Sequence, residues 1–186
     1  MLPTVDGPEH VSLNHGLHFT GGEPFLNFNL LESAVETAEF YGIPSTFVET
    51  NAVWCVDKKL TKQKMLLLKN KGLKGILISV NPFYLEWVPF RRTKMAVETG
   101  YEIFGLNMFV YQIECFRLFT GLGIEGTLPY DTYKKLERRG SPRNIEFFFM
   151  GRAAYRLGDD AFRYRADDLF WAGCVGGFQK ALAQPF

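Results

Sequence analysis

Three stretches of this chain repeat the same order of residue types, and few folds can accommodate such a repeat. They span residues 41–51, 71–81 and 104–114. In each, a glycine closes a helix-like run, an apolar stretch rich in β-branched or aromatic residues follows, and a polar residue ends it (Asn51, Asn81 or Glu114). A glycine at this place is typical of the left-handed residue that follows a helix. Units recurring about every 30 residues predict parallel strands joined by crossover helices.

The same reading extends to the whole chain. We expect strands at 16–20, 46–49, 75–80, 108–113 and 145–150, and helices at 25–41, 58–71, 89–104 and 166–182. The strands are almost continuously apolar, as expected of a sheet covered by helices. One face of helix 25–41 is expected to be buried, formed by Leu26, Leu30, Ala34, Ala38 and Tyr41.

These elements predict an α/β fold of about five βα units with parallel strands. A closed eight-fold barrel takes about 250 residues, so a doubly wound sheet, a partial barrel or a piece of a longer barrel is expected. We expect one incomplete domain over 1–186, with a lead-in at 1–15, βα units at 16–151 and a polar, helical segment at 152–186.

Composition excludes several classes of protein. The 186 residues carry 21 Lys and Arg against 20 Asp and Glu, so no excess of positive charge is available to neutralise nucleic-acid phosphates. The sequence contains no apolar run of the roughly 18 residues that a membrane helix needs, and it begins without the pattern of a signal peptide. Cys55, Cys115 and Cys174 lie far apart, which predicts no disulfide framework and favours a reducing cytoplasm.

Functional groups of parallel α/β folds lie at the carboxyl ends of the strands. This rule selects the polar loops 20–24, 49–53, 79–83 and 112–115, although Asn, Ser and Thr at such places are also typical helix caps. The most specific loop is TGGEP, in which two glycines permit positive φ and close approach of a ligand. Glu23 can present a carboxylate to an ammonium group, and it would repel a phosphate. Pro24 suits the first turn of the next helix.

The stretches HFTGGEPFLNFNLL, FVETNAV and LISVNPF, at their spacing, resemble the second to fourth strands of radical S-adenosylmethionine enzymes. The resemblance covers about residues 16–151 and implies a partial (βα)6-type barrel. It also implies that the intact protein is an enzyme that binds S-adenosylmethionine on a [4Fe-4S] cluster. With an external electron donor, that enzyme would cleave the cofactor to a 5′-deoxyadenosyl radical, which abstracts hydrogen from an unknown small-molecule or peptide substrate.

The resemblance also implies a set of cofactor-binding residues after each strand: Gly21, Gly22, Glu23 and Pro24, then Asn51, then Ser79 and Asn81, then Gln112 and Glu114. The first group would contact the methionine amino group of the cofactor. Ser79 and Asn81 match residues that reach its ribose or carboxylate. Gln112 and Glu114 would face the cavity near its adenine.

One departure from the family pattern is large, because no cysteine precedes Gly21 and the CxxxCxxC cluster loop is missing. The resemblance therefore implies a fragment that holds no metal ligands and is inactive alone. Two other interpretations remain open. One is a non-catalytic nucleotide- or partner-binding barrel that has lost its cluster. The other is a cluster-independent hydrolase or isomerase that uses Glu23, Glu49 and Glu114, with no histidine or lysine partner expected at a strand end.

Overall fold

The computed structural model describes residues 16–137. The chain divides into two compact units, Met1–Tyr130 and Asp131–Phe186. The strands are β1 (Gly16–Phe19), β2 (Ser45–Thr50), β3 (Gly75–Ser79) and β4 (Met108–Tyr111). The helices are η1 (Pro24–Asn27), α1 (Phe28–Phe40), α2 (Lys58–Asn70), α3 (Pro82–Leu85), α4 (Phe90–Phe104), η2 (Gly105–Asn107), α5 (Ile113–Gly121) and α6 (Tyr130–Glu137). The predicted strand 145–150 and helix 166–182 lie outside the described residues.

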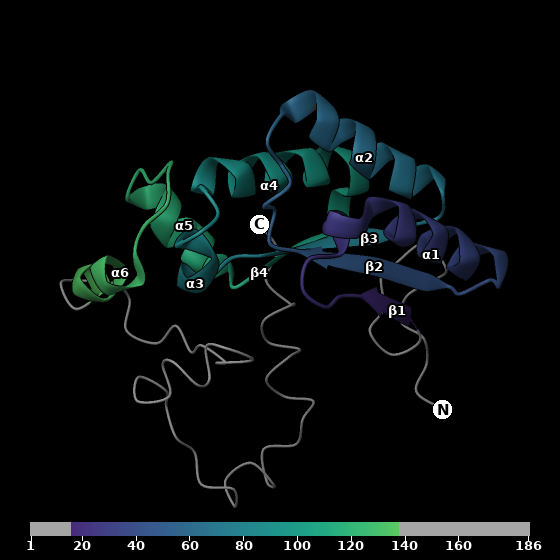
Figure 1. The fold of residues 1–186 in the computed structure, drawn as a ribbon, viewed down its shortest axis with the longest axis horizontal. Helices are drawn as coiled ribbons and strands as arrows, with labels where there is room; N and C mark the ends of the chain where they lie inside the picture. The colour runs from purple at the N-terminus through teal and green to yellow at the C-terminus, as the bar shows by residue number, and fades with distance from the viewer. Residues whose placement is uncertain (1–15, 138–186) are drawn as a thin grey trace, which may run out of the picture. The chain divides into compact units, whose positions relative to one another are not determined.

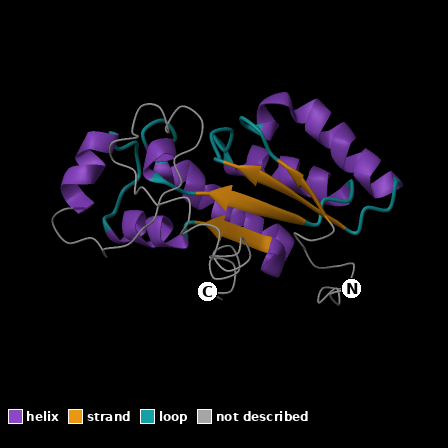
Figure 2. Ribbon diagram, turned by 90° about the horizontal axis from the view of Figure 1, so that it is seen from below, coloured by secondary structure: helices purple, strands orange, loops and turns teal. Residues whose placement is uncertain are grey.

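The four strands form one parallel sheet in the order β1-β2-β3-β4, which confirms the predicted α/β class with parallel strands. Helices α1, α2 and α4 cover one face of this sheet (Figure 1). Figure 2, seen from below, shows the strands in front of these helices. A strand order that follows the sequence, with the crossover helices on one face, is compatible with a partial βα barrel. A doubly wound sheet reverses its strand order, and residues 16–137 contain no such reversal.

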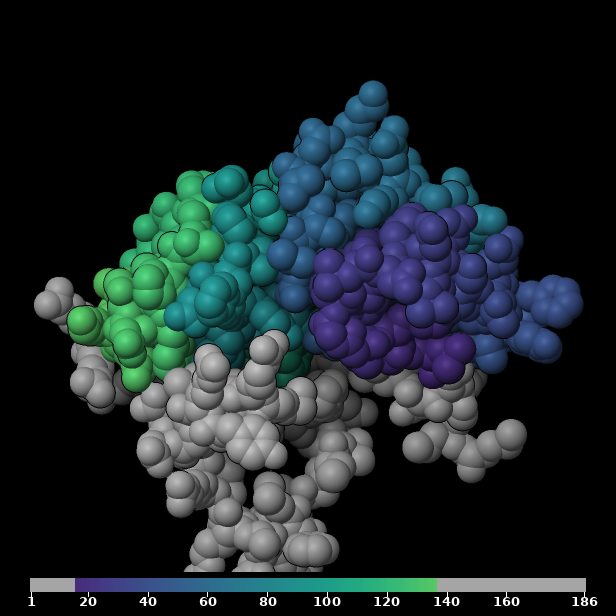
Figure 3. All heavy atoms as spheres, in the orientation of Figure 1, coloured from purple at the N-terminus to yellow at the C-terminus, as the bar shows by residue number. Residues whose placement is uncertain are grey.

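The sheet packs tightly against the helices. All five residues of β3 are buried, as the apolar run GILIS predicts. A Cβ on Gly100 of α4 would lie 2.9 Å from Met108 Cγ and 3.3 Å from Ile76 Cγ2, so α4 approaches the sheet this closely because Gly100 has no side chain. The core of the layer includes side chains with no exposed surface: Val35, Val48, Met65, Leu68, Ile76 and Ile78. In the space-filling view the atoms of α1 meet those of α2 (Figure 3).

The expected helix 25–41 is divided in two. Asn27 has φ −113° and ψ 72°, which ends η1, and its side-chain oxygen accepts a hydrogen bond from Leu30 N as the cap of α1. Of the predicted buried face only Ala38 is confirmed as buried, because the helix buries the stripe next to the predicted one. The buried side chains of α1 are Leu31, Val35 and Ala38. The exposed ones include Leu30 at 64% and, beside the helix, Leu26 at 77% and Tyr41 at 73%.

The other helices differ from the prediction mainly at their ends. Helices α2 and α4 match the expected ranges 58–71 and 89–104 to within one residue at each end. The predicted strand 108–113 was too long, because the chain leaves β4 after Tyr111 and α5 begins at Ile113. The short helices α3 and α5 were not predicted. None of the helices in the described part of the chain is long and apolar enough to cross a membrane.

Candidate functional site

The site lies where the carboxyl ends of the four parallel strands meet. The first loop there leaves β1 through Gly21 and Gly22, with φ values of +100° and +43°. These left-handed values favour glycine on backbone grounds. A Cβ on either residue would meet no atom within 4 Å, so the space beside this turn is open.

Glu23 fastens this turn to the end of β2. Its Oε1 accepts hydrogen bonds from Thr50 Oγ1 (2.8 Å) and Phe25 N (3.2 Å), and its Oε2 accepts one from Asn51 N (2.8 Å). The residue is only 9% exposed. Burial, and to a smaller degree the negative charge of Glu49, raise the pKa of the Glu23 carboxyl. Because Oε2 has one partner among the described residues, it retains capacity to accept another hydrogen bond.

The loop after β2 is built by its own polar groups. Thr50 Oγ1 accepts hydrogen bonds from Ala52 N (3.1 Å) and Trp54 Nε1 (2.9 Å), and Asn51 Oδ1 accepts one from Val53 N (2.9 Å). Ala52 has φ +64°, an uncommon value for a residue with a side chain. Asn51 thus holds the loop with its oxygen, while its amide nitrogen has no partner among the described residues.

Ser79 is the last residue of β3 and Asn81 lies in the loop after it, and the two side chains have different partners. Ser79 is buried, and its hydroxyl donates a short hydrogen bond to Glu49 Oε1. Asn81 Oδ1 accepts a hydrogen bond from Tyr84 N (2.9 Å) and so caps α3. Asn81 is therefore a helix cap, which was the alternative role expected for polar residues in these loops. Its amide nitrogen can still donate a hydrogen bond to another group.

Gln112 and Glu114 lie at the start of α5. Gln112 has φ +62° and ψ +58°, and its Oε1 is buried with no hydrogen-bond partner among the described residues. A buried acceptor without a donor is costly, so Gln112 is suited to a donor group that enters from outside. Glu114 belongs to the first turn of α5 and is exposed, and its side chain forms no ion pair within residues 16–137.

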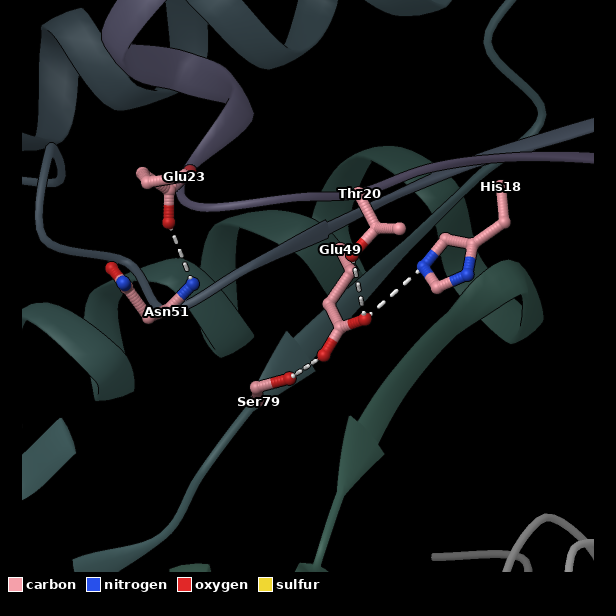
Figure 4. Close-up of polar contacts among 6 residues, drawn as sticks. All are labelled: His18, Thr20, Glu23, Glu49, Asn51 and Ser79. Atoms are coloured by element: carbon pink, nitrogen blue, oxygen red, sulfur yellow. Dashed lines mark hydrogen bonds and ion pairs between the residues drawn. The ribbon is translucent and has the colours of Figure 1, made fainter. Parts of the chain in front are cut away.

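The structure adds a cluster that sequence reasoning missed, formed by His18, Thr20 and Glu49 together with Ser79 (Figure 4). His18 Nε2 lies 3.1 Å from Glu49 Oε2, and Thr20 Oγ1 donates a hydrogen bond of 3.3 Å to the same oxygen. Strand alternation was the available signal, because His18 and the next residue but one, Thr20 just after β1, point to the same side as Glu49 of β2. The register of β1 and β2, which pairs His18 with Phe47, brings His18 next to Glu49. This register cannot be read from the sequence.

Two carboxylates, Glu23 and Glu49, lie at this edge, and Arg92 reaches it by donating a hydrogen bond of 2.6 Å to Val53 O. Within residues 16–137, neither Glu23 nor Glu49 forms an ion pair with a lysine or arginine. Burial first, and then the charge of Glu49, raise the pKa of the Tyr84 and Tyr111 phenols, which places both rings within the electrostatic reach of this carboxylate. A ligand with a positively charged group suits such an edge better than an anion does.

Residues 16–137 contain no group of three or more His, Cys, Asp or Glu side chains placed to hold a metal ion. Cys55 and Cys115 are both buried and form no disulfide within residues 16–137, and burial raises the pKa of the Cys55 thiol to about 12. Cys174 lies outside the described residues. The described residues therefore do not fit a [4Fe-4S] cluster, which requires a compact set of thiolate ligands. Comparison of the chain with protein-family models, with curated proteins and with solved structures finds no match.

Proposed function

We propose that this chain is the cofactor-binding wall of a radical S-adenosylmethionine barrel and that it binds S-adenosylmethionine at the carboxyl edge of β1–β4. The observation that carries the proposal is the TGGEP turn, which leaves the end of β1 in a left-handed glycine conformation and fixes Glu23 beside the end of β2. The sequential strand order, with α1, α2 and α4 on one face, supports a partial (βα)6-type barrel.

The chemistry of the edge suits the cofactor. S-adenosylmethionine carries an ammonium and a sulfonium, and the carboxylate of Glu23, which forms no ion pair with a lysine or arginine within residues 16–137, favours both. The ammonium would bind beside Gly21, Gly22 and Pro24, donating to the remaining acceptor capacity of Glu23 Oε2.

The polar groups that the loops leave unused suit the remainder of the cofactor. The amide nitrogens of Asn51 and Asn81 are donors for its carboxylate or ribose hydroxyls, with Ser79 nearby. The buried Gln112 Oε1 would accept a hydrogen bond from the adenine amino group. Glu114 is exposed and is the weakest member of the proposed set.

The described residues lack cluster ligands, so we derive no step through a [4Fe-4S] centre. Radical chemistry, the electron donor and a small-molecule or peptide substrate belong to the proposed intact enzyme. For this chain we limit the proposed function to binding the cofactor.

Isothermal titration of the full chain with S-adenosylmethionine tests the proposal. The informative variant is Asn81→Asp, because aspartate still caps α3 through a side-chain oxygen but replaces the amide donor by a negative charge. We expect unchanged thermal stability and at least a tenfold loss of affinity, which corresponds to about 1.4 kcal/mol. Asn27→Asp makes the same change at the exposed cap of α1 and is expected to retain wild-type affinity. Absence of binding by the folded wild-type chain, or wild-type affinity in Asn81→Asp, would refute the proposed site.

A further inference from the structure

The polar cluster of His18, Thr20, Glu49 and Ser79 lies on the inner face of the sheet, which we define as the face opposite α1, α2 and α4. Ile76 and Met108 contact Gly100 of α4, so they mark the helix-covered face. Side chains alternate along each strand, which places Ser79 on the inner face. The register aligns Glu49 with Leu77, and therefore Glu49 also lies on the inner face.

His18 is held there in one orientation. Its ring stacks on Phe47 with centroids 4.3 Å apart and an interplanar angle of 14°. The hydrogen-bonding distance of 3.1 Å from Nε2 to Glu49 Oε2 then fixes the rotation of the ring in its own plane. Its side chain is nevertheless 36% exposed, so the ring is oriented and remains accessible.

Glu49 is in turn positioned by two hydroxyl groups. Ser79 donates to Oε1 and Thr20 donates to Oε2, so both carboxylate oxygens are fixed (Figure 4). An ionised carboxylate only accepts hydrogen bonds, and Nε2 of the neutral imidazole must therefore carry the proton. The lone pair of His18 is then on Nδ1, the nitrogen that does not face Glu49.

We propose that His18 and Glu49 form a proton-transfer pair on the inner face, in which His18 Nδ1 accepts a proton from a hydroxyl or amine group of a bound substrate. The O–H or N–H bond of the substrate breaks, and an N–H bond forms at Nδ1. The positive charge of the resulting imidazolium lies beside the carboxylate of Glu49, and the proton later returns to product or water. This pair does not depend on the binding of S-adenosylmethionine, since neither His18 nor Glu49 belongs to the set that would contact the amino-acid and adenine ends.

Within residues 16–137, His18 is the ion-pair partner of Glu49. The ionisable groups that Glu49 affects include Glu23 from the glycine turn, Tyr84 from α3 and Tyr111 from β4, and none of these can carry a positive charge. No lysine or arginine in residues 16–137 forms an ion pair with Glu49, so no competing cation neutralises it there. A carboxylate that orients an imidazole and stabilises its protonated form is a recurring arrangement for general-base chemistry.

The tautomer of His18 provides the first test. Long-range ¹H–¹⁵N spectra of the ¹⁵N-histidine-labelled full chain report which ring nitrogen carries the proton. We expect the Nε2–H tautomer for His18 in the wild type and a mixture of tautomers in Glu49→Gln. Glu98→Gln, an exposed glutamate of α4, is the matched control and should leave the tautomer unchanged. A wild-type Nδ1–H tautomer would overturn the proposal.

Reactivity provides the second test, with p-nitrophenyl acetate as the probe. A basic Nδ1 attacks the ester carbonyl carbon, p-nitrophenolate leaves, and water hydrolyses the acetylimidazole to acetate. We expect His18→Asn to lose most of the rate above buffer, His15→Asn to keep it, and Glu49→Gln to show a several-fold reduction with His18 intact. Circular dichroism establishes that each variant is folded. If His18→Asn is folded and its rate is unchanged, the proposal is overturned. If His18→Asn does not fold, an unchanged rate in Glu49→Gln overturns the proposal.

Discussion

The hydroxyl group of Thr50 is the centre of the network that holds the candidate site together, and Thr50→Val removes it with little change of shape. Thr50 is 1% exposed, and its Oγ1 donates to Glu23 while accepting from Ala52 N and Trp54 Nε1. Valine keeps the branched side chain that suits a strand. The substitution therefore isolates the three hydrogen bonds from packing and propensity.

The size of the effect follows from those three bonds. Losing a hydrogen bond to a charged group costs about 1.5–3 kcal/mol, and each buried N–H left without an acceptor costs about 1–3 kcal/mol before relaxation. Burial of the new methyl group returns about 0.8 kcal/mol. Because relaxation and water recover part of the loss, we expect Thr50→Val to lower the free energy of unfolding by about 2–4 kcal/mol.

Thr46→Val on the same strand is the matched control. Thr46 is equally buried, but its Oγ1 donates only to Gly72 O (3.2 Å), and the Lys74 amide that it accepts from also donates to Thr46 O. No amide is left without a partner, so a loss of about 1 kcal/mol is expected. Urea unfolding followed by far-ultraviolet circular dichroism measures both variants without relying on the fluorescence of Trp54. Equal destabilisation by the two substitutions would refute the assignment of Thr50 as the centre of the network.

Three other predictions concern burial and packing. Because burial raises the pKa of Glu23, the stability it contributes is fully present below its unfolded-state pKa and is lost as the pH rises through its folded-state pKa. Urea unfolding across this pH range should therefore show the stability of wild type falling relative to Glu23→Gln. The Cys55 thiol, with its pKa raised to about 12, should react with Ellman's reagent at pH 8 only as fast as the protein opens; fast labelling of Cys55 in the folded double variant Cys115→Ser, Cys174→Ser would contradict this. Gly100→Ala should destabilise the chain by about 1–3 kcal/mol through the clash with Met108, whereas Gly121→Ala, with open space at its Cβ position, should be neutral or stabilising in thermal melts.

The sequence predicted the strands well because their signals are local. A continuous apolar run such as GILIS is typical of a strand buried on both faces, and the structure buries every residue of β3. The buried face of α1 was harder to predict, because apolar residues stand at neighbouring positions, Leu30 beside Leu31 and Ala34 beside Val35. Both stripes fit the spacing of a helix face, and the structure buries Leu31 and Val35. Gln112 adopts a left-handed conformation without being glycine, so no residue type marked the end of β4.

The sequence predicted which loops form the candidate site, but it did not predict which side chains contact one another there. The rule for parallel strands selected the loops that hold Glu23, Asn51 and Ser79, and the structure joins Glu23 to the Asn51 backbone. The partners of Glu49 required the register between β1 and β2, which aligns His18 with Phe47. A shift by one residue would place His18 on the opposite face, and composition does not distinguish the two registers.

The two carboxylates at this edge, Glu23 and Glu49, differ in burial and in the number of hydrogen bonds that hold them. Because of this difference, the two proposals can be tested separately. Glu23 is buried, and both of its oxygens bind donors from the loops, so its removal disturbs the scaffold together with any ligand that the scaffold binds. The Glu49 side chain is 28% exposed and has His18 beside it, so its removal changes the electrostatics of the inner face with a smaller structural cost. Loss of cofactor binding in Glu23→Gln would therefore not identify a contact with the ligand. Loss of reactivity in Glu49→Gln, in a chain that still binds S-adenosylmethionine as wild type does, would assign proton transfer to the inner face and cofactor binding to the glycine turn.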